Sequence, residues 1–269
     1  MRAIRFFVTL LIFLIALGAA LYTQRVDIRE WYESLRAPEL PEAVGYEDGA
    51  SEISPLPEGG LGGVGAQTNE LNGSILDTQE TSLNPPLVSG ETESEEALAV
   101  VASINLAVPF TPQAPHGVWD LPYQEACEEA SVFMVAEYFK GTPEGLIDAN
   151  QADDAILGIV DLEESMSLPM DVTIDELSRV ALAGWNLQSK QIENPTIDDI
   201  KAQLIAGRPV IVPLAGRLLG NPYFTAPGPV YHMLVIRGFT SDGQFITNDP
   251  GTYRGEAYLY DFDTIMEAM

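Results

Sequence analysis

The chain has 269 residues, of which 46% are hydrophobic, and its 40 acidic residues outnumber its 13 basic ones to give a formal net charge of −27. This length and hydrophobic fraction suffice for one folded domain with additional segments. A surface this acidic repels the phosphates of nucleic acid and anionic lipid headgroups, so we expect no nucleic-acid partner.

The first 23 residues have the pattern of a targeting segment, because Arg2 and Arg5 precede the uninterrupted apolar or weakly polar run Phe6–Tyr22. As a helix this run spans roughly 25 Å, close to the lower limit for crossing a bilayer. We favour a signal anchor over a cleavable signal peptide, because the run exceeds the roughly 7–15 residues of a signal-peptide core. The small residues at 16–20 leave cleavage as the alternative. The basic start predicts that the remainder lies outside the cytoplasm, attached to the cell membrane by a single span, or secreted if cleaved.

Two connecting segments follow the targeting segment. Residues 24–36 mix aromatic and aliphatic side chains with charges, which predicts a short amphipathic helix beside the membrane. Residues 37–97 are rich in proline, glycine, serine and acidic residues and contain no lysine or arginine. Such a composition buries too little apolar surface to offset the entropy cost of ordering, so we expect a disordered acidic stalk. The folded domain is then expected at 98–269.

Cys127 is the only cysteine of the chain, so it has no partner for an intramolecular disulfide. Polar residues after Pro122, followed by apolar residues at helical spacing, predict that Cys127 lies in or near the first turn of a mostly buried helix. The positive end of a helix dipole favours a thiolate there. The neighbouring carboxylates oppose it by like charge, namely those of Glu125, Glu128 and Glu129.

Most of the predicted helices come before the group of antiparallel strands, rather than alternating with strands along the chain. This order favours an α+β fold with an antiparallel sheet. We expect strands at 97–108, 208–214, 230–239, 244–248 and 255–260, and helices at 143–159, 173–183, 196–206 and from 262 onward. The helix that begins at Thr173 has the Thr-x-x-Glu pattern of a capping box.

His232 lies near the start of the predicted strand 230–239, and Asp249 directly follows the predicted strand 244–248. The Asp-Gly pair in the connection 240–243 predicts a hairpin, which brings the histidine and the carboxylate to one edge of the sheet. The order is then nucleophile, base and an acceptor that orients the base. Asn248 is an alternative orienting residue, because neighbours in a strand point to opposite faces.

The second histidine, His116, lies in a loop bounded by proline and glycine, where no regular element holds it in place. We therefore expect it to be solvated. Two distant histidines and one cysteine offer no set of ligands at zinc-binding spacing, so we expect no metal and no other cofactor.

Four blocks of the chain together resemble the papain-like cysteine peptidases related to the enzymes that process bacteriocin leader peptides. The blocks are Val108–Gln113, Cys127–Ser131, Tyr231–Gly238 and Asn248–Pro250, within a region from about Ser103 to the C-terminus. The resemblance implies that Cys127 is the nucleophile, His232 the base and Asp249 the residue that orients the base. It also implies that Gln113 contributes to the oxyanion hole, for which Gln124 is a rival because it lies nearer to the cysteine.

The sequence thus predicts a papain-like α+β domain, with a cleft between the Cys127 helix and the sheet edge that carries His232. The expected function is an exported, membrane-tethered thiol hydrolase that cleaves peptide or amide bonds in a peptide or protein substrate. One alternative is a catalytically inactive module on the same fold that binds a peptide or a wall fragment. A second is a transglutaminase-like acyl transferase, which uses the same order of residues.

Overall fold

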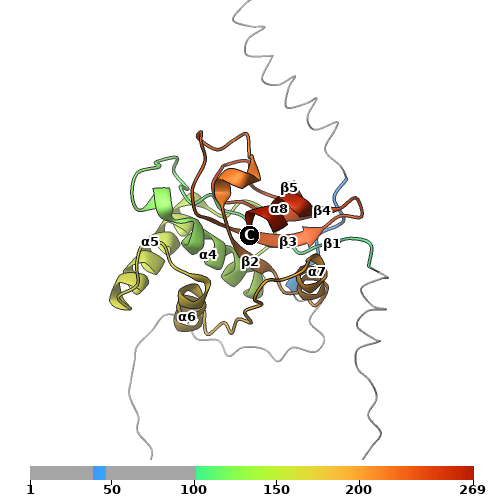
Figure 1. Ribbon diagram of the computed structural model, residues 1–269. Coiled ribbons are helices and arrows are strands. Elements are labelled where there is room, and N and C mark those ends of the chain that lie inside the picture. Colours follow the sequence, from blue (N-terminus) through green and yellow to red (C-terminus); the bar gives the residue numbers. More distant parts are fainter. Residues whose placement is uncertain (1–38, 47–100) are drawn as a thin grey trace, which may run out of the picture. The chain divides into compact units, whose positions relative to one another are not determined.

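The computed structural model describes residues 39–46 and 101–269 (Figure 1). The chain divides into two units, 1–40 and 41–269, and the second contains the folded domain. The predicted targeting segment, the juxtamembrane helix and most of the predicted stalk lie outside the described residues. Among the helices of the described part, none is long and apolar enough to cross a membrane.

A five-stranded antiparallel sheet forms one half of the domain (Figure 1). Its strands are β1 Ile104–Asn105, β2 Val210–Leu214, β3 His232–Phe239, β4 Gln244–Asn248 and β5 Tyr258–Asp261. β3 is the central strand: β4 and then β5 lie on one side, and β2 and β1 pair with successive parts of β3 on the other. All eight residues of β3 are buried, as its run of β-branched and large apolar residues requires.

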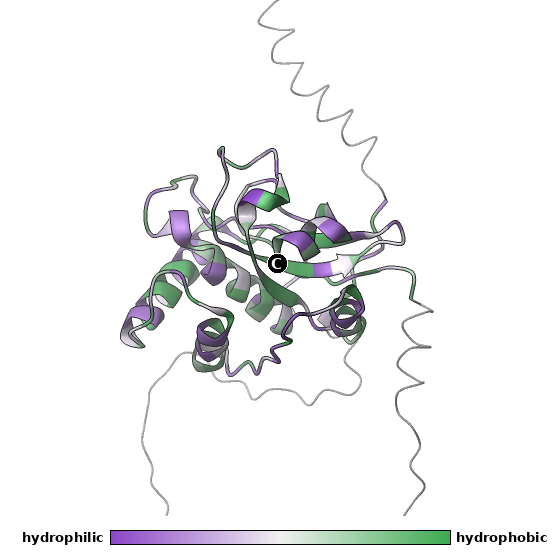
Figure 2. Ribbon diagram, viewed as in Figure 1, coloured by the Kyte–Doolittle hydropathy of each residue, from purple (hydrophilic) through white to green (hydrophobic). Residues whose placement is uncertain are grey.

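The helices form two groups, one packed around the helix that begins at Cys127 and the other packed against the strands. The segments are η1 Tyr123–Glu125, α4 Cys127–Phe139, α5 Ala149–Ser165, α6 Ile174–Trp185, α7 Ile197–Ile205, η2 Gly216–Leu219 and α8 Phe262–Ala268. Every residue of α4 from Cys127 to Tyr138 is buried, because this helix contacts β3 as well as α5 and α6. In Figure 2, α5 and α6 carry both hydrophilic and hydrophobic residues, as helices with one solvent-facing side do.

The predicted α+β architecture is confirmed, and the predicted helix starts at Thr173 and Thr196 are correct. Thr173 and Thr196 each accept a hydrogen bond from the backbone three residues later in complete capping boxes. The predicted helix 143–159 is displaced, because Asp148 caps α5 through the N–H groups of Asn150 and Gln151. Residues 97–100 of the predicted strand 97–108 lie outside the described residues, and of residues 101–108 only β1 belongs to the sheet.

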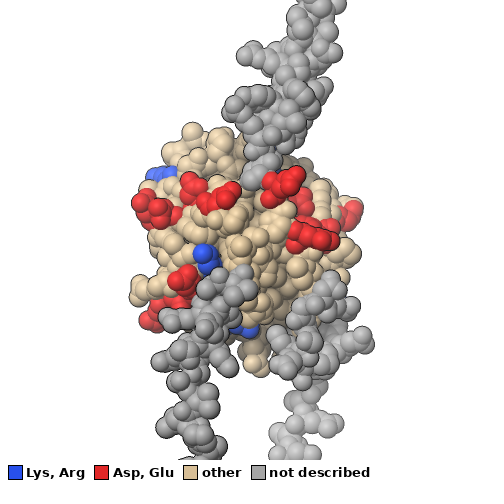
Figure 3. All heavy atoms as spheres, turned by 90° about the vertical axis from the view of Figure 1, so that its right-hand side faces the viewer, with Lys and Arg blue, Asp and Glu red and all other residues tan. Residues whose placement is uncertain are grey.

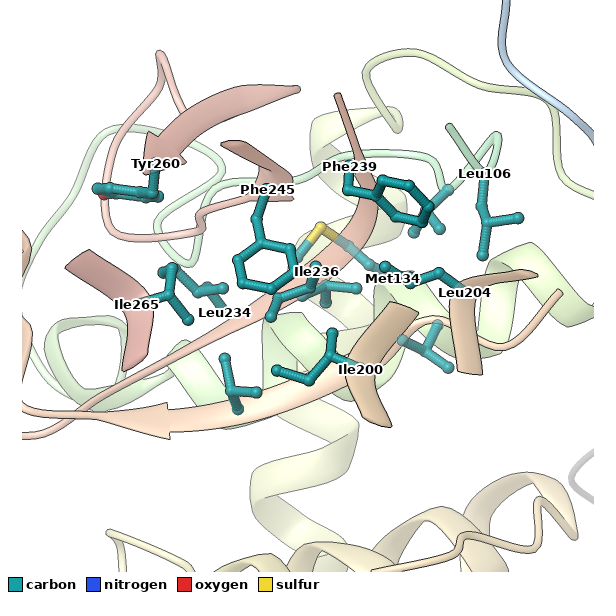
Figure 4. Close-up of a cluster of buried hydrophobic side chains, with 14 of the residues drawn as sticks. Leu106, Met134, Ile200, Leu204, Leu234, Ile236, Phe239, Phe245, Tyr260 and Ile265 are labelled. Atoms are coloured by element: carbon teal, nitrogen blue, oxygen red, sulfur yellow. The ribbon is translucent and has the colours of Figure 1, made fainter. Parts of the chain in front are cut away.

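The main core lies between the sheet and the helices α4, α7 and α8. Figure 4 shows side chains of this core pointing toward one another from all of these elements. Those labelled are Leu106, Met134, Ile200, Leu204, Leu234, Ile236, Phe239, Phe245, Tyr260 and Ile265. A second cluster fills the space between α4, α5 and α6 and includes Cys127. The cysteine therefore lies at the border of a packed core. On the face drawn in Figure 3, acidic side chains are more numerous than basic ones, in keeping with the net charge.

Residues 41–46 fall inside the range predicted as a disordered acidic stalk, yet they contact the rest of the folded domain. The Val44 N–H donates to Asn105 O at 2.8 Å, and the Ala107 N–H donates to Val44 O at 2.8 Å. The ring of Tyr46 packs edge-on against those of Tyr138 and Phe139. This short segment therefore extends the domain beyond β1.

Gly238 provides a test of the pairing between β1 and β3. A Cβ atom there would lie 2.2 Å from Ile104 O, which is backbone of the neighbouring strand. We expect Gly238→Ala to lower the free energy of unfolding by at least about 2 kcal/mol, measured by chemical denaturation. Gly158→Ala is the matched control, because Gly158 is an exposed residue inside α5 with open space around it. That variant should be more stable by about 0.5–1 kcal/mol. Equal stability of the two variants would contradict this packing.

Candidate active site

Cys127 is the first residue of α4, so its backbone N–H is one of the donors that the helix itself leaves without a partner. Its side chain is 5% exposed. The Met233 N–H of β3 donates to Cys127 Sγ at 3.3 Å, and Sγ donates to Glu128 Oε2 at 2.9 Å. The thiol therefore lies between the start of a buried helix and the first residues of the central strand.

His232 and Asp249 lie together, with His232 Nε2 2.8 Å from Asp249 Oδ1. His232 begins β3, and Asp249 directly follows the last residue of β4, which pairs with Val235. Both side chains are buried, at 2% and 0% exposure. Because the carboxylate engages Nε2, Nδ1 is the ring nitrogen that is left for a second partner.

Asp249 accepts three further hydrogen bonds. Its Oδ2 accepts from the Tyr260 hydroxyl at 2.6 Å and from Asn221 Nδ2 at 3.2 Å, and its Oδ1 accepts from the Gly251 N–H at 3.0 Å. Burial raises the pKa of Asp249, but the charge and hydrogen bond of His232 and the bonds from Tyr260 and Gly251 outweigh burial, so the pKa lies below its ordinary value. The carboxylate is thus held ionised beside the imidazole.

The alternative orienting residue, Asn248, faces away from His232. Its Nδ2 donates to Val108 O at 3.0 Å and to Pro109 O at 3.1 Å, while its Oδ1 accepts from the Ala257 N–H at 3.1 Å. This arrangement follows from the alternation of side chains along β4. Asn248 therefore links three segments of the domain, and Asp249 is the neighbour that reaches the histidine.

A sequence profile described as the Peptidase_C39 like family matches residues 105–268. The chain belongs to this family. The match covers β2 to β5, the helices, and Cys127, His232 and Asp249. The packing of helices against a curled antiparallel sheet fits the predicted papain-like fold. The domain is accordingly cysteine-peptidase-like. A comparison with curated proteins gives no match to this chain.

The two glutamines considered for the oxyanion hole have different positions in this Peptidase_C39 like domain. Gln113 is buried, and its Nε2 donates to the carbonyl oxygens of Tyr123 and Gln124, both at 2.9 Å. The Gln124 side chain is exposed and donates to Glu125 Oε1. Gln113 therefore holds the segment that leads into Cys127, with both amide hydrogens on backbone carbonyls.

Sequence reasoning did not identify Asn221 and Tyr260 as site residues, because neither lies near a motif. Asn221 lies in the loop between η2 and β3, and Tyr260 lies on β5 opposite Phe245. Phe224, in the same loop as Asn221, packs edge-on against His232 with ring centroids 5.3 Å apart. His116 is exposed, as expected for a loop histidine.

Three buried glutamates surround the Cys127 end of α4. Glu128 and Glu129 follow the cysteine, and Glu163 reaches them from α5; all three are at most 4% exposed. Glu129 and Glu163 are hydrogen-bonded to each other, and burial followed by mutual repulsion raises the pKa of Glu129. Burial also raises the pKa of Glu163, to about 7. Each of the three carboxyl groups has one oxygen with no hydrogen-bond partner among the described residues. This part of the core therefore favours protonated carboxyl groups.

A pocket of about 700 Å³ lies elsewhere in the Peptidase_C39 like domain, lined by parts of α4, α6, α7 and β2 and by residues 187–195. Its volume is typical of ligand pockets. Cys127, His232 and Asp249 are not among its lining residues. The pocket is therefore separate from the candidate active site.

The raised pKa values of the Glu129–Glu163 pair make folding stability depend on pH. The unfolded chain loses these protons above a pKa of about 4.5, whereas the folded protein keeps them to higher pH. Their contribution to the free energy of unfolding is therefore greatest at low pH and falls as pH rises toward the folded-state pKa. We expect Glu163→Gln to reduce this fall between pH 5 and 8 by an amount on the order of 1 kcal/mol, measured by denaturant unfolding. Glu164→Gln, at an exposed position on the same helix, should leave the fall unchanged. A wild-type stability that rises over this range would show that the pair is ionised in the folded protein.

Proposed function

We propose that this domain is a thiol hydrolase that cleaves peptide or amide bonds with Cys127 as nucleophile, His232 as base and Asp249 as the residue that orients the base. The observation that carries the proposal is the 2.8 Å bond between His232 Nε2 and a buried carboxylate. That bond fixes the imidazole with Nδ1 available for the cysteine, whose sulfur is hydrogen-bonded to the residue next to His232. The membership in a cysteine-peptidase-like family supports the same assignment.

The chemistry follows from these positions. His232 Nδ1 takes the proton of Cys127 Sγ, and the thiolate forms a bond to the carbonyl carbon of the substrate. The imidazolium, stabilised by Asp249, gives its proton to the leaving amine as the C–N bond breaks and a thioester remains. His232 then takes a proton from water, the resulting hydroxide attacks the thioester, and the carboxylate product leaves while the thiol is restored. The full cycle consumes one water per bond cleaved.

The negative charge on the carbonyl oxygen needs donors near Cys127. The Cys127 N–H is suited to this role, because it is the first amide of α4 and lies at the positive end of the helix dipole. We propose Gln113 as the second donor, because it is buried against the segment immediately before the cysteine. One of its amide hydrogens must then leave a carbonyl of that segment when substrate binds. Gln124, whose exposed side chain is bonded to Glu125, has less support for this role.

The location proposed for this activity is outside the cytoplasm. It rests on the basic start and the apolar run of residues 6–22, which have the composition of a signal anchor. The substrate would then be a peptide or protein outside the cytoplasm. An anchored enzyme would bind it at the membrane, and a secreted enzyme would bind it in the medium.

A second candidate function is a catalytically inactive binding module on the same fold. The observation in its favour is the hydrogen bond from the thiol to Glu128, which keeps the proton on sulfur. Burial first, and then the charge and hydrogen bond of Glu128, raise the pKa of Cys127 well above its ordinary value. The two candidates differ in whether the bound thiol becomes a nucleophile.

Peptide cleavage by the full-length protein in detergent tests the proposed triad. A library of mixed peptides is incubated with enzyme, and new amino termini are counted by mass spectrometry. We expect Cys127→Ala and His232→Ala each to lower the cleavage rate by at least about 10³-fold, and Asp249→Asn by about 10²-fold or more. His116→Ala is the matched control and should cleave at the wild-type rate, because His116 is an exposed loop residue.

Cleavage that persists in Cys127→Ala would sink the proposed nucleophile. Absence of cleavage by wild type, together with retained peptide binding, would support the inactive module. An added primary amine separates hydrolysis from acyl transfer, because a transglutaminase-like enzyme would attach the amine to the acyl group.

The proposed membrane attachment has its own test. We expect the full-length protein to remain in the membrane fraction after alkaline carbonate extraction. We also expect an added protease to degrade the domain in cells whose outer layers have been removed but whose cell membrane is intact. Replacing the apolar run 6–22 by a polar sequence of equal length should move the protein to the soluble fraction inside the cell. A protein that is soluble and protected from external protease without this replacement would contradict the proposal.

A further inference from the structure

Glu128 has a side chain that is hydrogen-bonded to the candidate nucleophile, and the reaction above gives it no role. Its side chain is 0% exposed, and Oε2 accepts the hydrogen bond from Cys127 Sγ at 2.9 Å. Oε1 is buried and has no hydrogen-bond partner among the described residues. An ionised carboxylate in such surroundings is costly, because it has lost water and gained few donors in exchange.

Another buried glutamate of the same helix is stabilised in a different way. Glu137 is 4% exposed, but it accepts hydrogen bonds from Lys140 at 2.6 Å, from Thr142 at 2.6 Å and from Gln151 at 3.4 Å. Its charge is therefore neutralised and its oxygens are occupied. Glu128 has a thiol as its partner instead, so the proton of that thiol and the charge of Glu128 depend on each other.

The two protonation states of Glu128 have opposite effects on the sulfur. Ionised, the carboxylate accepts the S–H hydrogen bond and repels a thiolate. Protonated, the carboxyl group has an O–H that can donate to a thiolate along the same 2.9 Å contact. A neutral Glu128 also removes the negative charge that lies nearest to the sulfur.

We propose that Glu128 controls the nucleophile: ionised, it holds Cys127 as an unreactive thiol, and protonated, it stabilises the thiolate paired with the His232 imidazolium. This inference rests on the proposed function, because it requires Cys127 and His232 to act as a pair. The change takes up one proton from solvent. The solvent proton binds the Glu128 carboxylate, the thiol proton passes to His232 Nδ1, and the reverse transfers release one proton.

The groups around this contact determine the pH at which the change occurs. Facing Glu128 and Cys127 are Glu129 of α4, Glu163 of α5, Asp171 before α6, and Tyr231 and His232 at the start of β3. His232 is the one cation-forming group in this described set, and the others are acidic. Burial raises the pKa of Glu128 to about 7; the bond from Cys127 and its own N–H lower it, Asp171 raises it and His232 lowers it. Glu128 therefore changes charge near neutral pH.

The expected consequence is a reactive cysteine below neutral pH and an unreactive one just above it. An ordinary thiol shows the opposite trend, because it ionises as pH rises through roughly 8.5. The sign of the pH dependence thus separates control by Glu128 from simple thiol ionisation.

The test is the rate of iodoacetamide alkylation of Cys127 in the full-length protein between about pH 5 and pH 9. We expect the wild-type rate to fall about tenfold as pH rises through about 7, the pKa of Glu128. In Glu128→Gln the amide donates to the thiolate at every pH, so the rate should stay high across neutral pH. Glu163→Gln is the matched control: it removes a buried carboxyl group that does not contact the sulfur, and should keep the fall at a somewhat lower pH.

A second measurement needs no variant. Since Cys127 is the only cysteine, the Raman S–H stretching band reports this residue alone. We expect the band of wild type to grow as pH rises through about 7, the pKa of Glu128, whereas an ordinary thiol loses its band as pH rises. This measurement remains decisive if Glu128→Gln fails to fold.

The outcomes separate this inference from the proposed function. Identical pH profiles for wild type and Glu128→Gln, both slowed by His232→Ala, would overturn control by Glu128 and leave the Cys127–His232 pair in place. Profiles that rise with pH in every variant, His232→Ala included, would overturn both. Cleavage of the peptide library should follow the alkylation profile, with wild type most active below neutral pH.

Discussion

The burial of the first turn of α4 is the constraint on which the rest of this structure depends. Because α4 is enclosed by β3, α5 and α6, each polar group at its start must find a partner inside the protein or remain without one. Strand β4 ends opposite Val235, so the start of β3 has β2 on one side and the helix on the other. The Met233 N–H can therefore donate to the sulfur of Cys127. The end of a strand thus determines where the thiol lies.

Asp249 and the glutamates around Cys127 favour opposite protonation states, although all of them are buried carboxyl groups. Asp249 is fully buried but accepts bonds from His232, Tyr260, Asn221 and Gly251, which keep it charged. The glutamates around Cys127 are equally buried but have few donors, which favours their neutral forms. The number of donors, rather than depth of burial, separates the two behaviours.

The parts of the site that the sequence predicted are those set by short-range chemistry. The Asp-Gly hairpin aligned the strands that carry His232 and Asp249, and the capping threonines fixed the starts of α6 and α7. Asn221 and Tyr260 could not be predicted, because they reach Asp249 from a loop and from β5, and that contact depends on how distant segments pack. The two hydrogen bonds that Gln113 donates to backbone carbonyls depend in the same way on the path of the chain before Cys127.

The pairing of Val44 with the strand at Asn105–Ala107 has a topological consequence. Backbone hydrogen bonds thus join described residues that precede segment 47–100 to described residues that follow it. A single cut within it leaves the N-terminal part attached to the domain without a covalent link. Separation of residues 41–46 from the domain then requires both such a cut and the loss of this short β-bridge.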